Sequence, residues 1–243
     1  MLFYKIVQNG LGGKITRLLI DLYSKTKSYI KIDNILSGAI KETFGVNQGG
    51  VMSPLLFTEF LTDLGKHLAK SGVFITETEI LSYLLWADDL FLISSTPEGL
   101  QKLLHDLFEY CKQWHLIVNT MKTKIMIYTN RKTTTTLKEF YFNGQKVDVV
   151  DKYNYLGCIF TQNPSKPKQV QINSSLDNAR KALFKVYRHL KPFGQNLPTI
   201  ACHLFDTLVK PVIDYGAEIW APGANLDEID KFERKFLKSV LSV

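Results

Sequence analysis

The stretch Tyr83-Leu-Leu-Trp-Ala-Asp-Asp-Leu-Phe-Leu-Ile93 places two adjacent carboxylates, Asp88 and Asp89, between two apolar runs. Each run has the length and composition of a short buried strand, which predicts a hairpin with both acids at its tip. Because an unpaired carboxylate is costly to bury, acids in such a place are protonated, paired or bound to a cation. One interpretation is a Mg²⁺ site at the tip of the hairpin, and the other is a solvated turn that contains two acids.

A glycine-rich segment lies upstream of this hairpin, Gly45-Val-Asn-Gln-Gly-Gly-Val-Met-Ser-Pro-Leu-Leu-Phe57. Its glycines would let a ligand approach the backbone. Ser53 is the expected N-cap of a helix over residues 54–68, with Pro54 at its first position. The segment either caps this helix or also lines a nucleotide pocket, in which case Gln48 supplies the hydrogen-bonding side chain.

The composition favours a polyanionic partner in a reducing compartment. The 243 residues carry a net charge of +7, and the pI is about 9.1, as in proteins that bind nucleic acids. The three cysteines lie far apart without a CxxC pair, which argues against a disulfide framework or a zinc site. Because the chain has neither a signal-peptide pattern nor a membrane-spanning run, we expect an intracellular protein, nuclear or cytoplasmic, without a membrane partner.

The order of the remaining patterns indicates an α+β fold, in which an antiparallel sheet is backed by helices and followed by a helical C-terminal region. Hydrophobic periodicity and turn signals predict the elements. One predicted helix ends near Asn9. Further predicted helices cover residues 13–23, 95–114, 174–190, 199–212 and 227–241. Predicted strands cover residues 27–33, 39–44 (after a turn at Ser37-Gly38), 125–128 and 153–160 (with a bend or bulge at Gly157), and Asn143-Gly144 predicts a hairpin over 140–147. Ser174 and Asp177 form a possible capping box, and Cys111 belongs to an apolar helix face, without chemistry of its own.

A basic segment begins near Gln162. From residue 162 to residue 191 there are seven basic residues and one acid, a net charge of +6 (seven minus one). Lys181, Lys185 and Arg188 share one face at helical spacing, which is either a solvated face or a contact for a phosphate backbone. Lys122, before the predicted strand at 125, is likewise either solvated or a ligand for a triphosphate.

Four motifs in this order resemble the reverse transcriptases of non-LTR, LINE-like retrotransposons. The segment Gly45–Phe57 is similar to the family's Gly-Val-Arg-Gln-Gly-Cys-x-x-Ser-Pro-Leu-Leu-Phe motif, and Leu85-Trp-Ala-Asp-Asp-Leu90 to its Tyr-Ala-Asp-Asp box. Asn119-Thr-Met-Lys-Thr-Lys124 matches Asn-x-x-Lys-Thr, and Tyr155-Leu-Gly-Cys158 matches Tyr-Leu-Gly. Residues 208–220 are also similar to the family's thumb segment, so the likeness spans nearly the whole chain.

The resemblance implies a right-hand polymerase fold, with a partial palm over residues 1–161 and a helical thumb over 162–243. It implies RNA-directed DNA polymerisation by two Mg²⁺ ions, with an RNA template, a DNA primer and deoxynucleoside triphosphates as partners. Asp88 would be the principal catalytic and metal ligand, beside Asp89. The other implied contacts are Gln48, Gly49 and Lys122 with the nucleotide, Tyr155, Leu156 and Gly157 with the primer end, and Lys181, Lys185 and Arg188 with the duplex.

The chain also departs from the family pattern. Asn47 stands where the family has arginine, Gly50 where it has cysteine, and Trp86 where it has tyrosine. The family's upstream Ala-Phe-Asp motif, which holds a further catalytic aspartate, and its fingers are not found in the 243 residues. We therefore expect a truncated chain with weak or no activity alone. The loss of one bridging carboxylate corresponds to ~4 kcal/mol, or roughly a thousandfold in rate.

Two other functions compete with this interpretation. A non-catalytic remnant that still binds nucleic acid would show salt-sensitive duplex binding that survives Asp88→Ala. A palm polymerase of another lineage, such as a group II intron maturase, is the third hypothesis, and the thumb segment argues against it.

Overall fold

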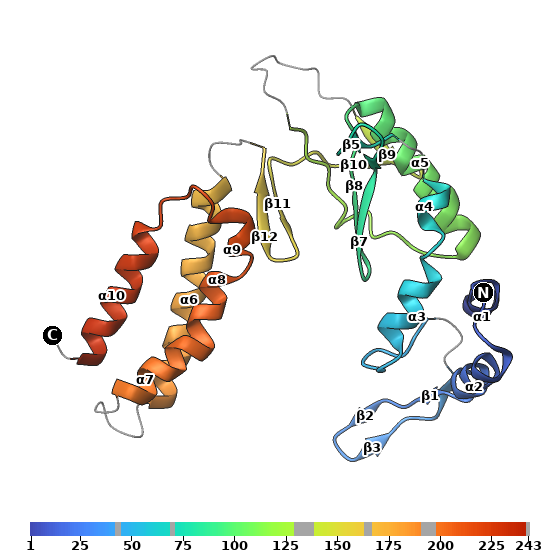
Figure 1. The fold of residues 1–243 in the computed structure, drawn as a ribbon. Helices are drawn as coiled ribbons and strands as arrows, with labels where there is room; N and C mark the ends of the chain where they lie inside the picture. The colour runs from blue at the N-terminus through green and yellow to red at the C-terminus, as the bar shows by residue number, and fades with distance from the viewer. Residues whose placement is uncertain (42–44, 69–70, 129–138, 163–166, 191–197, 242–243) are drawn as a thin grey trace. The chain divides into compact units, whose positions relative to one another are not determined.

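The computed structural model describes the chain except for residues 42–44, 69–70, 129–138, 163–166, 191–197 and 242–243 (Figure 1). The described residues divide into two compact units. The first comprises Met1–Thr120 and Leu137–Lys146, and the second comprises Met121–Thr136 and Val147–Val243. No helix in the described ranges is both long and apolar enough to cross a bilayer.

The first unit combines helices with short hairpins. Its helices are α1 (Leu2–Gln8), α2 (Gly13–Ser24), α3 (Ser53–Phe60), α4 (Leu64–His67) and α5 (Pro97–Trp114). Its strands are β1 (Lys27–Ser28), β2 (Lys31–Ile32), β3 (Ile35–Leu36), β4 (Ile40–Lys41), β5 (Val73–Phe74), β6 (Ile80–Leu81), β7 (Tyr83–Trp86), β8 (Asp89–Leu92), β9 (Phe140–Phe142) and β10 (Gln145–Val147), the last of which ends in the second unit. Ile6, Leu19 and Leu56 form a small core where α1 meets α2 and α3.

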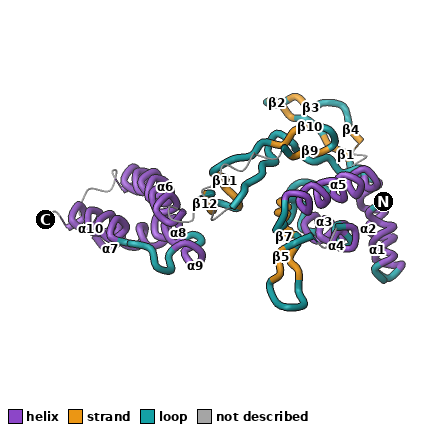
Figure 2. Tube along the Cα trace, turned by 90° about the horizontal axis from the view of Figure 1, so that it is seen from above, coloured by secondary structure: helices purple, strands orange, loops and turns teal. Residues whose placement is uncertain are grey.

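The second unit is a helical cluster with one hairpin. The hairpin is β11 (Lys152–Tyr155) with β12 (Cys158–Thr161). The helices are α6 (Pro167–Leu190), α7 (Pro198–Leu204), the π-helical segment η2 (Phe205–Val209), α8 (Lys210–Asp214), α9 (Ala217–Trp220) and α10 (Asp227–Leu241). They pack around one buried core that includes Ile172, Val209 and Ile213, and Figure 2 shows these helices gathered together.

The α+β class predicted from the sequence is confirmed, but the strands do not form one sheet. Within the described residues they pair two by two into six short ribbons. The segment over Lys27–Lys41 returns antiparallel as predicted, but its turn lies at Asp33 and Asn34 instead of Ser37-Gly38. Residues 42–44 of its second predicted strand lie outside the described ranges. The Asn-Gly hairpin is confirmed, with positive φ at Asn143 and Gly144.

Three strand and capping predictions are wrong. Residues 125–128 form no strand, because Ile125 makes just one isolated parallel bridge, to Val149. Residues 153–160 form a hairpin instead of one strand bent at Gly157, since the chain reverses completely at Leu156 and Gly157. Ser174 lies inside α6, so it caps nothing, and Asp177 instead pairs with Arg180 at 2.6 Å.

The predicted helix over 54–68 is broken into α3 and α4 by a distant side chain. In a continuous helix the Phe60 carbonyl would accept a bond from the Leu64 amide. Here that carbonyl accepts from Lys5 Nζ at 2.7 Å, and the Leu64 amide turns to the Leu61 carbonyl at 3.0 Å. The start also differs by one residue: Met52 is the N-cap, and the Ser53 hydroxyl donates to the Asn47 carbonyl.

Candidate active-site hairpin and basic helix

Asp88 and Asp89 lie at the tip of the β7–β8 hairpin. Tyr83 pairs with Leu92 and Trp86 with Asp89, so Ala87 and Asp88 form a two-residue turn. Ala87 has a φ of 52°, in the left-handed region that residues other than Gly, Asn and Asp seldom adopt. The hairpin is the predicted one, but its strands are not buried: Trp86 is 69% exposed and Leu84 48%.

The two carboxylates are open to solvent. Both residues are exposed, and neither side chain has an ion pair or hydrogen bond within the described parts of the chain. Carboxylate oxygens are ligands that Mg²⁺ prefers, and it is commonly bound through one or two carboxylates together with substrate phosphates and water. Asp88 and Asp89 could therefore supply the two protein carboxylates of such a Mg²⁺ site. In the described residues, no group of three His, Cys, Asp or Glu side chains lies close enough together to hold a metal ion.

The glycine-rich loop forms a tight turn before α3. Gly49 has a φ of +81°, and the Gly50 amide donates to the Asn47 carbonyl at 3.0 Å. The Ser53 hydroxyl donates to the same carbonyl at 2.5 Å, so two bonds hold the turn closed. Gln48 and Gly49 are exposed, which leaves the Gln48 amide group available for a ligand.

Residues Lys122 and Tyr155–Gly157 belong to the second unit. The Lys122 side chain is exposed, and its carbonyl accepts from the Tyr153 hydroxyl at 3.2 Å. Leu156 and Gly157 have φ values of 49° and 80° and connect Tyr155 to Cys158. Positive φ at both residues of a two-residue loop is the pattern of a type I′ turn.

The basic face predicted on α6 is present and exposed. Lys181, Lys185 and Arg188 are all exposed, and none of them has an ion pair within the described residues. Phe184 lies between them along the helix and is 70% exposed. Lys166 and Lys191, which contribute to the charge of this segment, lie outside the described ranges.

One charged cluster was missed by the sequence analysis. Lys5, 4% exposed, donates from Nζ to Asp63 Oδ1 at 2.5 Å and to the Tyr110 hydroxyl at 2.7 Å. The same Nζ lies 3.8 Å from the Trp114 ring centroid, in a cation–π contact. The signal that could have found it is a lysine next to Ile6, on a face of α1 that the apolar periodicity assigns to the core.

The pKa shifts in this cluster follow from burial and pairing. Burial lowers the pKa of Lys5 although Asp63 opposes it. Burial alone would raise the pKa of Asp63, but hydrogen bonds from Lys5 and Tyr110 outweigh it and hold that pKa below its ordinary value. Burial raises the pKa of the neighbouring Cys111 thiol to about 11, which disfavours the reactive thiolate form.

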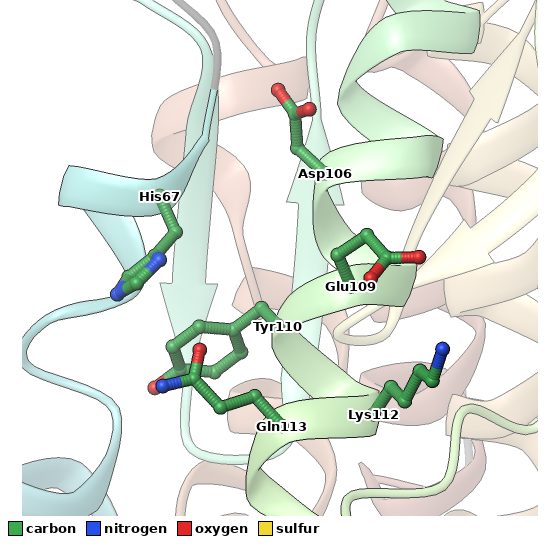
Figure 3. Close-up of a pocket in the computed structure, with 6 residues that line it drawn as sticks. All are labelled: His67, Asp106, Glu109, Tyr110, Lys112 and Gln113. Atoms are coloured by element: carbon green, nitrogen blue, oxygen red, sulfur yellow. The ribbon is translucent and has the colours of Figure 1, made fainter.

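A hollow of about 470 Å³ opens beside this cluster, between α4 and α5. Figure 3 shows His67 of α4 facing Tyr110 of α5, and their ring centroids are 5.2 Å apart. The other lining side chains, Asp106, Glu109, Lys112 and Gln113, all come from α5. None of the predicted site residues is among them, so this hollow is separate from the Asp88 hairpin.

A family model described as "Reverse transcriptase (RNA-dependent DNA polymerase)" matches residues 2–160. The chain belongs to this family. The matched range contains the Asp88 hairpin, the glycine-rich loop and the Leu156 turn, and it ends before α6.

Three similar proteins show the same likeness. The RNA-directed DNA polymerase from mobile element jockey of Drosophila melanogaster is 23% identical over 260 residues, covering 98% of this chain and 27% of its own length. The Pol polyprotein from the type-1 retrotransposable element R2 of Nasonia vitripennis is 28% identical over 171 residues, covering 65% and 16%. A transposon-derived protein of Caenorhabditis elegans is 28% identical over 158 residues, covering 61% and 52%.

These matches confirm the predicted likeness to non-LTR reverse transcriptases. The chain spans about half of the C. elegans relative and a smaller share of the other two.

Proposed function

We propose that this chain is an RNA-directed DNA polymerase domain of a non-LTR retrotransposon. The observation that carries the proposal is the exposed pair Asp88 and Asp89, without an ion pair in the described residues, at a hairpin turn inside the reverse transcriptase match. An RNA template, a DNA primer and deoxynucleoside triphosphates are the proposed partners. In this proposal residues 1–161 form a partial palm, and residues 162–243 form a helical thumb.

The hairpin supplies an adjacent pair of oxygen donors, Asp88 and Asp89. Four residue pairs of antiparallel register hold β7 against β8, and the Tyr83 side chain lies against Gly65 of α4, where an added Cβ would be 2.3 Å from its hydroxyl. Asp88 and Asp89 would hold Mg²⁺ through their carboxylates. When bound, the metal ion supplies charge stabilisation for a phosphoryl group in transfer.

The other predicted residues have separate roles in the proposal. The Gln48 side chain and the loop at Gly49 would contact the incoming nucleotide or the templating base. Lys122 would bind anionic phosphate oxygens as a point charge. The turn at Tyr155–Gly157 would contact the primer end, and Lys181, Lys185 and Arg188 would contact the duplex backbone.

Primer extension on an RNA template with Mg²⁺ tests the catalytic role of Asp88. Asp88→Asn keeps the shape of the side chain but removes the negative charge that holds the metal ion. We expect incorporation, whatever its absolute level in this chain, to fall by roughly a thousandfold or to below detection, which corresponds to ~4 kcal/mol.

Asp33→Asn is the matched control, because Asp33 is also an exposed aspartate in the two-residue turn of a hairpin of the same unit. It should leave incorporation unchanged. Equal incorporation by the wild-type chain and Asp88→Asn, or equal losses in both variants, would contradict the proposal.

The basic face of α6 supports a second candidate function, a nucleic-acid-binding module without catalysis. Its three exposed cations carry no counter-charge in the described residues, which suits the backbone of a duplex. A wild-type chain that binds a duplex but never extends a primer, even at high protein concentration, would favour this function over the polymerase.

A further inference from the structure

The Leu156–Gly157 turn has an unusual backbone conformation for its sequence. Leu156 has a φ of 49°, in the left-handed region that side chains other than those of Gly, Asn and Asp seldom adopt. Its side chain remains 38% exposed, so packing of that side chain alone does not explain the conformation. A two-stranded hairpin is at best marginally stable by itself, and the turn therefore needs support from elsewhere in the unit.

Tyr215 supplies this support from the loop after α8. Its hydroxyl donates to the Leu156 carbonyl at 2.7 Å. Its ring lies so close to Gly157 that an added Cβ there would be 2.8 Å from the ring carbon Cε1. Figure 1 shows the β11–β12 hairpin beside α8 and α9, the two helices that precede and follow Tyr215 in the chain.

The position of Tyr215 is itself fixed. Its carbonyl accepts from Trp220 Nε1 at 2.9 Å, and Trp220 is 6% exposed within the helical core. Gly216 has a φ of +66°, and a Cβ added there would be 2.7 Å from Cys158 Sγ. Glycines at 157 and 216 thus permit the close approach of the two segments from opposite sides.

A second contact anchors strand β12 of the same hairpin. The Gln171 side chain of α6, 5% exposed, accepts from the Ile159 amide at 2.8 Å and donates to the Ser175 hydroxyl at 3.3 Å. The strand is therefore tied to α6, whereas the turn is tied to Tyr215. Removal of the Tyr215 hydroxyl should loosen the turn and leave the strand in place.

We propose that Tyr215 is a positioning residue that fixes the Leu156–Gly157 turn in the orientation that contacts the 3′ end of a nucleic-acid primer. This inference rests on the proposed function, in which the turn meets the primer end. Tyr215 touches no reacting group, and it acts through the backbone of the turn.

Tyr215→Phe tests the inference in the full chain, because it removes the hydroxyl and keeps the ring. Tyr187→Phe is the matched control, since it removes a hydroxyl that is hydrogen-bonded to Ser239 Oγ at 2.6 Å in the same unit. Amide hydrogen exchange over residues 155–158 should accelerate about tenfold in Tyr215→Phe and stay unchanged in Tyr187→Phe. Circular dichroism verifies that both variants are folded.

Binding to two probes then separates positioning from a purely structural role. One probe is a DNA–RNA hybrid with a recessed free 3′ end, and the other is the same hybrid with that end closed by a loop. We expect the wild-type chain to prefer the free end, and Tyr215→Phe to lose about fivefold on the free-ended probe alone. Gly157→Ala, whose Cβ would press on the Tyr215 ring, should give the same selective loss.

The inference is overturned by unchanged exchange of the turn in Tyr215→Phe, or by faster exchange with both affinities intact. It is also overturned by equal losses on the two probes, or by a wild-type chain that does not distinguish them. Each of these results leaves the polymerase proposal standing if Mg²⁺-dependent incorporation still requires Asp88. Failure of the Asp88 test with a selective loss in Tyr215→Phe would instead reject polymerisation and keep the turn as a binder of primer ends.

Discussion

Lys5 is the buried cation that holds α1 against the break between α3 and α4. Its ammonium donates to Asp63, to the Phe60 carbonyl and to Tyr110, and it lies over the Trp114 ring. A buried charge is tolerated where all its donors are satisfied, as here. Without Lys5, the half-buried Asp63 carboxylate would lose its ion pair and the Phe60 carbonyl would lose a hydrogen bond.

Lys5→Met should therefore destabilise the first unit by about 3 kcal/mol, the range for breaking a buried pair from one side. Urea unfolding followed by circular dichroism measures this loss. Lys25→Met is the matched control, because the Lys25–Asp21 pair is equally short, at 2.5 Å, but lies in solvent with side-chain exposures of 73% and 60%. The control should cost less than about 0.5 kcal/mol, and similar losses in the two variants would show that burial of Lys5 contributes nothing.

Among the elements, α6 combines two faces with different roles. One face contributes Ile172, Leu176 and Val186 to the core of the second unit. The opposite face exposes Lys181, Lys185 and Arg188. The helix α10 offers a useful contrast, because two of its four exposed cations are paired along the helix, Lys231 with Glu228 and Arg234 with Asp230.

Replacing Lys181, Lys185 and Arg188 by Gln should weaken duplex binding and flatten its salt dependence. Each lost phosphate contact lowers the slope of log K against log salt by about 0.9, so the three together should lower it by up to about 3. Fluorescence anisotropy over a salt series measures this slope. The triple variant of Lys231, Arg234 and Lys235 removes the same charge from α10 and should change the slope much less; a slope unaltered by the α6 variant would place the duplex contact elsewhere.

At the scale of the whole molecule, the described chain is two compact units, each with its own buried cluster. Units of this kind generally unfold separately unless a large apolar interface joins them. In the helical unit the buried cluster is centred on α6, η2 and α8. The first unit buries apolar side chains of α1, α3 and α5, Leu103 and Leu107 among them, and adds the Lys5 contacts.

Lys5→Met should therefore loosen the first unit alone. We expect faster amide exchange in α5, which contains Tyr110 and Trp114, and unchanged exchange in the centre of α6. Hydrogen-exchange mass spectrometry reports both helices in one experiment. An equal loss of protection in α6 would show that the two units unfold as one.

Local chemistry determined the elements that the sequence predicted well. The Asn143-Gly144 hairpin forms because both residues readily adopt positive φ. The helix α5 starts at Pro97 because the Thr96 hydroxyl accepts from the Gly99 amide at 3.1 Å. The order of motifs likewise determined the family, and the acidic hairpin follows from two apolar runs around Asp88.

Contacts between residues far apart in the chain decided the rest. The sequence alone predicts a continuous helix through Phe60, but Lys5, 55 residues away, takes the carbonyl that the helix needs. It also predicts one strand with a bend or bulge at Gly157, but the chain reverses at Leu156 and Gly157, and Tyr215, 59 residues from Leu156, holds that turn. Residues adjacent in the sequence determine the local preference for helix, strand or turn. A hydrogen-bond partner that lies far away in the sequence reaches a backbone group only when the chain has folded.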